Sequence, residues 1–108
     1  MQQADIYWSS EERNIASSAL SRAYDREITA TVDCVRKMAS DISQIEDVWK
    51  LHDFLSARRH DIDGKYDDRE SFLMFTLSKL IKDKLLDLSD LEGLAADKRT
   101  KVSMLTRM

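Results

Sequence analysis

One face of a predicted helix between residues 49 and 60 carries the side chains that are best suited to chemistry or recognition. At about 100° per residue, an indole, two imidazoles, a carboxylate and a hydroxyl share a stripe roughly 100° wide, with a guanidinium at its edge. In sequence order these residues are Trp49, His52, Asp53, Ser56, Arg59 and His60.

A second, aliphatic stripe lies about 130° away on the same helix, and we expect this stripe to pack inside the protomer. It consists of Val48, Leu51, Leu55 and Ile62. A surface helix needs only one apolar face, so the bulky indole of Trp49 on the polar face predicts a second interface. The partner there is either another copy of the chain or a different protein.

Catalysis is the first alternative for the polar stripe, because His52 and Asp53 on one helical face can polarise each other as acid and base. The chain offers no Gly-rich phosphate loop, no pair of metal-spaced histidines and no obvious nucleophile. We therefore predict a binding protein rather than an enzyme. The sharpest alternative is a histidine phosphotransfer or signalling adaptor protein that uses His52, although Leu51 and Trp49 crowd the approach that a phosphoryl donor needs.

Acidic residues between positions 61 and 70 resemble a calcium loop in composition but not in spacing. A loop that starts at Asp61 needs Gly at its sixth place and a bidentate acid at its twelfth, where this chain has Tyr66 and Phe72. We predict no metal site. The single cysteine, Cys34, has no Cys or His at ligand spacing, so we interpret it as a packing residue rather than a nucleophile.

The charge pattern disfavours nucleic acid as a partner. The 108 residues include 17 Lys and Arg against 20 Asp and Glu, and the two signs are interspersed. The one basic cluster, residues 58–60, is followed at once by Asp61 and Asp63, which suits local complementarity to a protein. With no leader, no long apolar run and no cysteine pair, we expect a cytoplasmic chain without membrane insertion.

The pattern predicts an all-α protein, because the chain has no Pro, two Gly and no period-two runs of β-branched residues. Four signals of the capping-box type precede apolar periodic runs. They are Ser9 with Glu12, Ser43 with Glu46, Asp67 with Glu70, and Ser89 with Glu92. We expect helices over about 10–39, 44–60, 68–86 and 90–106, with Gly64 as the stop after the second. The first two helices are either continuous through a bend or separated by a break.

The longest helix carries a coiled-coil seam in which the spacing alternates between four and three, and such a seam needs a long partner. Its residues are Ile28, Val32, Val35, Ala39 and Ile42. We expect the seam residues Ile28, Val32 and Val35, with Trp49, to form a dimer interface. The predicted architecture is an elongated homodimer of four-helix chains, with a stalk at about 9–62 and a compact head at about 66–106.

In the head, aliphatic residues define the packing faces of the third and fourth helices. The third helix has Leu73, Leu77, Leu80 and Ile81 on one face, and the fourth has Leu91, Leu94, Ala95, Val102 and Leu105. Phe75 falls roughly 160° from the centre of the third helix's apolar face, so it is a second aromatic residue on the polar side of a helix.

The run WKLHDFLSARRHDIDGKYDDRE, which starts at Trp49, closely resembles the cyanobacterial fluorescence recovery protein family. The resemblance continues through SFLMFTLSKL and LAADK, covers the chain from about Ser9 onward, and includes the placement of Trp8 and Tyr24. It implies a small all-helical homodimer with a stalk and a head, no cofactor and no enzymatic reaction.

Members of that family bind the photoactivated red form of the orange carotenoid protein, chiefly through its C-terminal domain. They accelerate its return to the orange form and its release from the phycobilisome, so antenna fluorescence recovers after non-photochemical quenching. The resemblance implies that Trp49, His52, Asp53 and Arg59 form a functional patch at or near the dimer interface. It further implies that Phe75 and Lys101 contact the carotenoid protein from the head, in the cytoplasm or at the cytoplasmic face of the thylakoid membrane. Oligomers beyond the dimer are left open.

Overall fold

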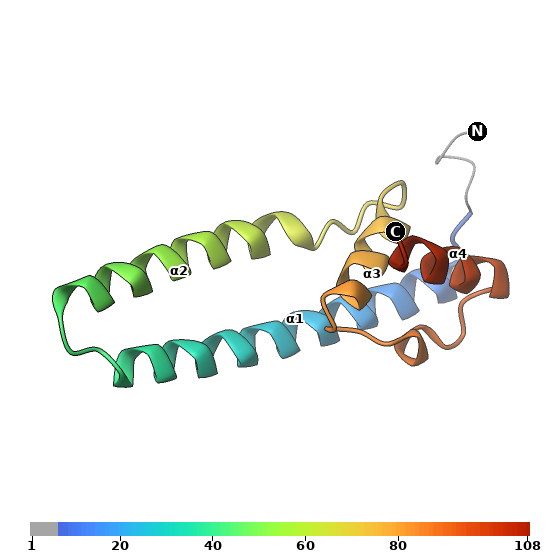
Figure 1. The fold of residues 1–108 in the computed structure, drawn as a ribbon. Helices are drawn as coiled ribbons and strands as arrows, with labels where there is room; N and C mark the ends of the chain where they lie inside the picture. Colours follow the sequence, from blue (N-terminus) through green and yellow to red (C-terminus); the bar gives the residue numbers. More distant parts are fainter. Residues whose placement is uncertain (1–6) are drawn as a thin grey trace.

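The computed structural model describes residues 7–108, and over these residues the chain is all-α, as predicted. The elements in order are α1 (Ser10–Ser40), α2 (Ile45–Lys65), α3 (Leu73–Lys82), the 3₁₀ helix η2 (Leu88–Leu91) and α4 (Ala96–Thr106). α1 and α2 form a long hairpin, and α3, η2 and α4 gather beside the first half of α1 (Figure 1). The molecule is elongated, with extents of 54, 25 and 24 Å.

The two long helices begin with side-chain caps, one of which is the predicted pair. The Ser9 hydroxyl accepts a hydrogen bond from the Glu12 amide, and the Ser9 amide donates to the Glu12 carboxylate, both at 3.1 Å. At the start of α2 the cap is Asp47 rather than Glu46, because its carboxylate accepts from the amides of Ser43 and Gln44. The chain reverses over residues 41–44, so α1 and α2 are separated by a break.

Three predicted helix boundaries are wrong. In one case the helix tolerates a glycine, and in the other two an acidic side chain binds a group other than the expected helix N-terminus. α2 continues through Gly64, where an added Cβ would meet nothing within 4 Å. α3 begins at Leu73 rather than 68, because Asp67 binds the amide and guanidinium of Arg69 instead of capping a helix. The segment from 90 to 95 is not part of α4 either, since the Asp90 carboxylate accepts from the Asp87 amide and closes η2.

The core lies between the first half of α1 and the C-terminal elements. Three alanines of α1 at helical spacing let the leucines of α3 approach closely, and the whole cluster excludes water. Its fully buried members include Ala16, Ala19, Ala23, Leu77, Leu80, Leu91, Val102 and Trp8. Burial of the predicted apolar residues is therefore confirmed for Leu73, Leu77, Leu80, Leu91, Leu94 and Val102, while Ile81 and Leu105 pack at the margin. Leu91 and Leu94 are buried from the segment before α4, however, and the predicted docking residue Ala95 is exposed.

The hairpin beyond this core buries little apolar surface, and here the prediction for the aliphatic stripe of α2 is wrong in part. Lys65 is the only buried residue of α2. Leu51 and Ile62 are half-buried, but Val48 and Leu55 are exposed. α1 provides most of the cover of α2, and the stripe that faces α1 is centred on the half-buried Phe54 and Arg58. The hairpin therefore keeps an apolar flank that no other described residue of the protomer covers.

Candidate functional site

The predicted polar stripe forms an exposed patch on α2, which we call the α2 patch and define as Trp49, His52, Asp53 and Arg59. The indole of Trp49 is 58% exposed. His52 Nδ1 lies 3.3 Å from Asp53 Oδ1, and Arg59 Nε lies 3.8 Å from Asp63 Oδ2. All these groups are mostly exposed, so their ion pairs contribute little to stability and the charges are available to a partner.

α2 brings His52 and Arg59 together around a shallow groove of about 420 Å³. The groove is lined by His52, Leu55, Ser56, Arg59, His60 and Asp63. Its exposed aliphatic member, Leu55, sits between basic and acidic groups, which is the composition of a protein recognition surface. Trp49 lies one turn away toward the hairpin tip and extends the same face.

The two head residues implied by the resemblance lie in separate hollows. Phe75 on α3 is 46% exposed and lines a groove of about 400 Å³ with Leu105 and Met108. Lys101 on α4 is exposed beside a different hollow that also borders Met74. Both residues lie at the end of the molecule away from the start of α2 (Figure 1), so one protomer does not gather all six residues into one site.

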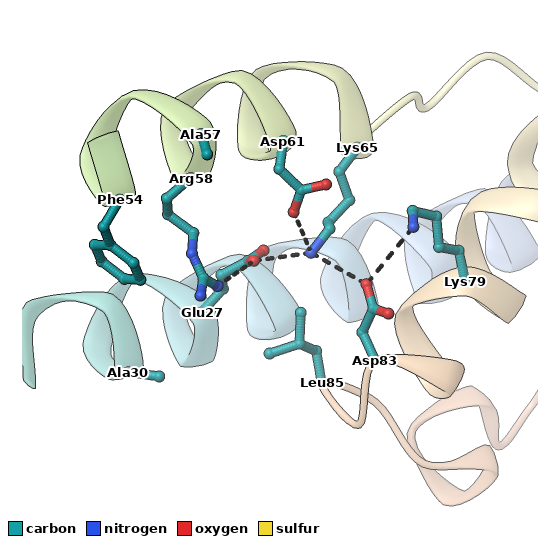
Figure 2. A pocket seen from close by; sticks show the side chains of 10 residues that line it. All are labelled: Glu27, Ala30, Phe54, Ala57, Arg58, Asp61, Lys65, Lys79, Asp83 and Leu85. Atoms are coloured by element: carbon teal, nitrogen blue, oxygen red, sulfur yellow. Dashed lines mark hydrogen bonds and ion pairs between the residues drawn. The ribbon is translucent and has the colours of Figure 1, made fainter. Parts of the chain in front are cut away.

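A buried charge network that our sequence reasoning missed fixes the base of the hairpin. Glu27 of α1 and Lys65 of α2 are 2% and 6% exposed, and Lys65 Nζ lies 2.8 Å from Glu27 Oε2. Lys65 Nζ also lies 3.2 Å from both Asp61 Oδ2 and Asp83 Oδ2, and the Tyr66 hydroxyl donates to Glu27 at 2.6 Å. Figure 2 shows Glu27, Asp61, Lys65 and Asp83 converging from α1, α2 and the end of α3.

The network keeps its groups in definite protonation states. Burial by itself would lower the pKa of Lys65, but Glu27, Asp61 and Asp83 raise it above its usual value, so the ammonium stays charged. Burial, together with the nearby Glu27 carboxylate, raises the pKa of Tyr66, so its hydroxyl remains a donor. A signal for this network was present in the sequence, because Glu27 continues the helical spacing of the buried residues Ala16, Leu20 and Ala23.

A second buried pair holds the head. Glu12 accepts hydrogen bonds from the Ala95 amide at 3.1 Å and from Lys98 Nζ at 3.0 Å. Burial would raise the pKa of Glu12, but the amides of Ala95 and Ser9 and the ammonium of Lys98 outweigh it and lower the pKa to about 2. Lys98 Nζ also lies 5.1 Å from the ring centroid of buried Trp8. We interpret Glu12, Lys98 and Trp8 as structural residues.

The arrangement of the α2 patch suits recognition rather than group transfer. In the part of the chain that the structure describes, the one side-chain hydrogen-bond partner of His52 is Asp53. No group of three or more His, Cys, Asp or Glu side chains within residues 7–108 could hold a metal ion. None of the helices described is long and apolar enough to span a bilayer.

Comparison with known proteins identifies the family that this chain matches. A sequence model described as "Photoprotection regulator fluorescence recovery protein" matches residues 8–106. The fluorescence recovery protein of Synechocystis is 46% identical over 108 residues, which is 100% of this chain and 99% of that protein.

Solved structures of such proteins also share the fold. The structure from Fremyella diplosiphon has 50% identity and a TM-score of 0.91, and the one from Synechocystis has 47% identity and the same TM-score. Each match covers 94% of this chain and 100% of the other.

Proposed function

The chain belongs to the fluorescence recovery protein family of cyanobacterial photoprotection regulators, and we propose that it binds the photoactivated orange carotenoid protein. Binding accelerates the return of that protein to its orange form and its detachment from the phycobilisome, which restores antenna fluorescence. The observation that carries this proposal is the full-length match to the family together with an aromatic and charged α2 patch that is exposed among residues 7–108.

Acceleration of a conformational change requires differential binding rather than a chemical step. The rate rises only if the protein binds the transition state for reassociation of the carotenoid protein's two domains more tightly than the separated red form. A preference of about 1.4 kcal/mol gives a factor of ten. A scaffold that contacts both domains at once supplies this preference through effective concentration.

We assign orienting roles to the charged members of the α2 patch and anchoring roles to the aromatic residues. Arg59, His52 and Asp53 steer the partner, because exposed charges at a rim set register and association rate. Trp49 and Phe75 provide the apolar area that becomes buried, as aromatic hot spots do. Lys101 adds a positive charge at the head. This division gives the stalk at about 9–62 and the head at about 66–106 separate contacts with the partner, chiefly with its C-terminal domain.

The working unit in this proposal is a homodimer formed through the uncovered flank of the hairpin. On ideal antiparallel helices, Val32 lies about 80° to one side of the line where α1 faces α2, and Val48 and Leu55 of α2 lie about 70° toward the same side. α3 borders the opposite flank, where Ala30 and Ala57 line a groove. The apolar flank is therefore continuous and free of the head, which suits an isologous interface.

The seam residues contribute unequally to this flank. Val32 is exposed, whereas Ile28 and Val35 are half-buried in the protomer. Trp49 lies farther round α2, at the rim of the proposed interface. The α2 patch would then stand at the edge of the dimer.

The roles in the α2 patch are tested with Arg59→Leu in a relaxation assay on photoconverted orange carotenoid protein, read from the red-to-orange absorbance change in the dark. We expect the variant to lose acceleration while circular dichroism and dimer mass stay unchanged. Lys50→Leu is the matched control, because Lys50 is an exposed cation about 180° around the same helix. A fully active Arg59→Leu dimer would refute the orienting role.

Self-association is tested with Val32→Glu. Burying an unpaired carboxylate in the interface should cost several kcal/mol and shift the protein toward monomer. Light scattering over a dilution series measures the shift. Asp33→Glu, a neighbouring exposed position off the flank, should leave the mass unchanged. An undiminished Val32→Glu dimer would place the interface elsewhere.

A further inference from the structure

A groove beside the first half of α1, which we call the tyrosine groove, has no role in the function proposed above. It is lined by residues of α1 and of the segment that joins α2 to α3, and its volume is about 530 Å³. Tyr24 and Tyr66 both line it, and their rings meet edge to face with centroids 5.5 Å apart. Tyr24 is 45% exposed, and the small Ser17 and Ser21 border the same space. The groove therefore has room for a side chain from outside the protomer, next to an accessible aromatic ring.

The ring of Tyr66 is held in place and is electron-rich. Its hydroxyl donates a hydrogen bond to Glu27 Oε1 at 2.6 Å. Glu27 is itself buried and paired with Lys65. A phenol that donates its proton to a carboxylate carries more electron density in its ring, and the face of such a ring attracts a cation. Because the ring is already fixed, little rotamer freedom is lost when a ligand binds beside it.

The pair of tyrosines has no cation of its own within residues 7–108. Elsewhere in this region, cation–aromatic contacts take both partners from this chain, with the cation between 4.5 and 5.2 Å from the ring centroid. They join Arg58 to Phe54, Arg69 to Phe72 and Lys98 to Trp8. No described cation makes such a contact with Tyr24 or Tyr66, so these rings are available to a cation from another molecule.

A carboxylate of the groove is also left without an ion-pair partner among the described residues. Asp68 lines the tyrosine groove and is exposed. Its two nearest candidate partners are bound elsewhere. Arg13 Nη1, on the groove wall, lies 3.1 Å from Glu70 Oε2. Arg69 Nη2, next in sequence, lies 2.7 Å from Asp67 Oδ2. The groove therefore presents one unneutralised negative charge together with its aromatic rings.

We propose that the tyrosine groove binds an arginine side chain of a partner protein. The planar guanidinium stacks on the ring of Tyr24 and pairs with Asp68, which suits arginine better than the strongly hydrated ammonium of lysine. The methylene stem packs against Leu20 and Leu73, two buried residues that border the groove. The groove shares no residue with the α2 patch or with the two head residues assigned above, so it is an additional docking point.

Binding of a small arginine derivative tests the site in the full-length protein. Isotope-labelled protein is titrated with N-acetylarginine amide, and its amide chemical shifts are followed by NMR. We expect shifts confined to residues 13–24 and 66–73, with a dissociation constant of about 1–10 mM. N-acetylcitrulline amide has nearly the same shape without the charge. At matched ionic strength it should bind about tenfold more weakly.

Two variants separate the aromatic contribution from the ionic one. Tyr24→Leu keeps an apolar side chain but removes the ring, and Asp68→Asn keeps the shape but removes the charge. We expect each to weaken the binding of N-acetylarginine amide about threefold to tenfold. Asp25→Asn is the matched control, because Asp25 is an exposed carboxylate beside Tyr24 in sequence that does not line the groove. Its affinity should stay within about twofold of the wild type.

Several outcomes would overturn the inference. Equal affinity for the arginine and citrulline ligands, or wild-type affinity in both Tyr24→Leu and Asp68→Asn, would show that the groove does not select a cation. Unchanged spectra at about 100 mM ligand would show that arginine does not enter. Shifts that appear only in dilute, monomeric samples would show that a second copy of the chain fills the groove. None of these outcomes bears on the regulator proposal, because the titration contains no carotenoid protein.

Discussion

Removing the carboxylate of Glu27 should loosen the whole base of the hairpin. In Glu27→Ala the ammonium of Lys65, whose side chain is 4% exposed, loses its nearest counter-charge at 2.8 Å. The Tyr66 hydroxyl loses its acceptor at 2.6 Å as well. In the variant, the Lys65 ammonium and the Tyr66 hydroxyl therefore stay buried but lose the carboxylate that compensates their burial.

The expected cost follows from the burial of each group. Breaking a buried ion pair from one side costs about 3–5 kcal/mol, and an orphaned buried hydroxyl costs about 1–3 kcal/mol. Asp61 and Asp83, both 3.2 Å from Lys65 Nζ, retain part of the compensation, so we expect a total loss of about 3–5 kcal/mol. This is a large share of the roughly 5–15 kcal/mol that stabilises a domain.

Urea unfolding at a fixed protein concentration measures the effect, because the stability of the proposed dimer would depend on protein concentration. Asp61→Ala is the control: its side chain is 49% exposed, and we expect a loss of no more than about 1 kcal/mol. The Glu27→Ala substitution should also increase the amide hydrogen-exchange rate more in α2 than in α3. If Glu27→Ala and Asp61→Ala unfold at the same urea concentration, the network does not hold the hairpin.

Three further predictions concern Glu12 and the two glycines. The pKa of Glu12 falls from 4.5 to about 2 on folding, so its contribution of at most about 3 kcal/mol is present above pH 4.5 and lost as the pH drops toward 2. Acid unfolding of Glu12→Gln should therefore be flatter over this range, and a wild-type slope would contradict the assignment. Gly93→Ala should cost about 1–3 kcal/mol in urea, because Gly93 has φ of 105° and the new Cβ would stand 2.6 Å from Ile15 Cδ1. Gly64→Ala, in open helical space, should instead stabilise by up to about 1 kcal/mol, and equal losses at both glycines would refute the steric argument.

Periodicity and capping predicted the parts of the fold that local interactions determine. The first capping box and the length of α1 follow from contacts within a few residues of Ser9, and the buried faces of the C-terminal helices follow from apolar spacing. The predicted starts of α3 and α4 were wrong because Asp67 and Asp90 bind groups that the spacing of apolar residues does not reveal. The Asp90 carboxylate pairs with Arg22 and Arg26 of α1 at 2.9 and 3.0 Å, across more than sixty residues of sequence.

The candidate site likewise has features that the sequence predicted and features that it did not. The exposed position of Trp49 and Phe75 was predictable, because each aromatic falls off the apolar face of its own helix. The burial of Glu27 was also predictable, from its helical spacing to Ala16, Leu20 and Ala23. Its pairing with Lys65 was not, because the pair joins residues 38 positions apart and exists only once the hairpin has closed. The direction in which α2 faces α1 was also misjudged, since a helix covered by one neighbour packs on a narrower stripe than its hydrophobic pattern suggests.

The most direct test of the regulator proposal is the dark relaxation rate of photoconverted orange carotenoid protein, followed by the red-to-orange absorbance change with and without this protein. Our account predicts faster relaxation at substoichiometric amounts, because a catalyst of a conformational change is released after each conversion. An unchanged rate across several carotenoid-protein variants, at protein concentrations where light scattering shows a dimer, would contradict it.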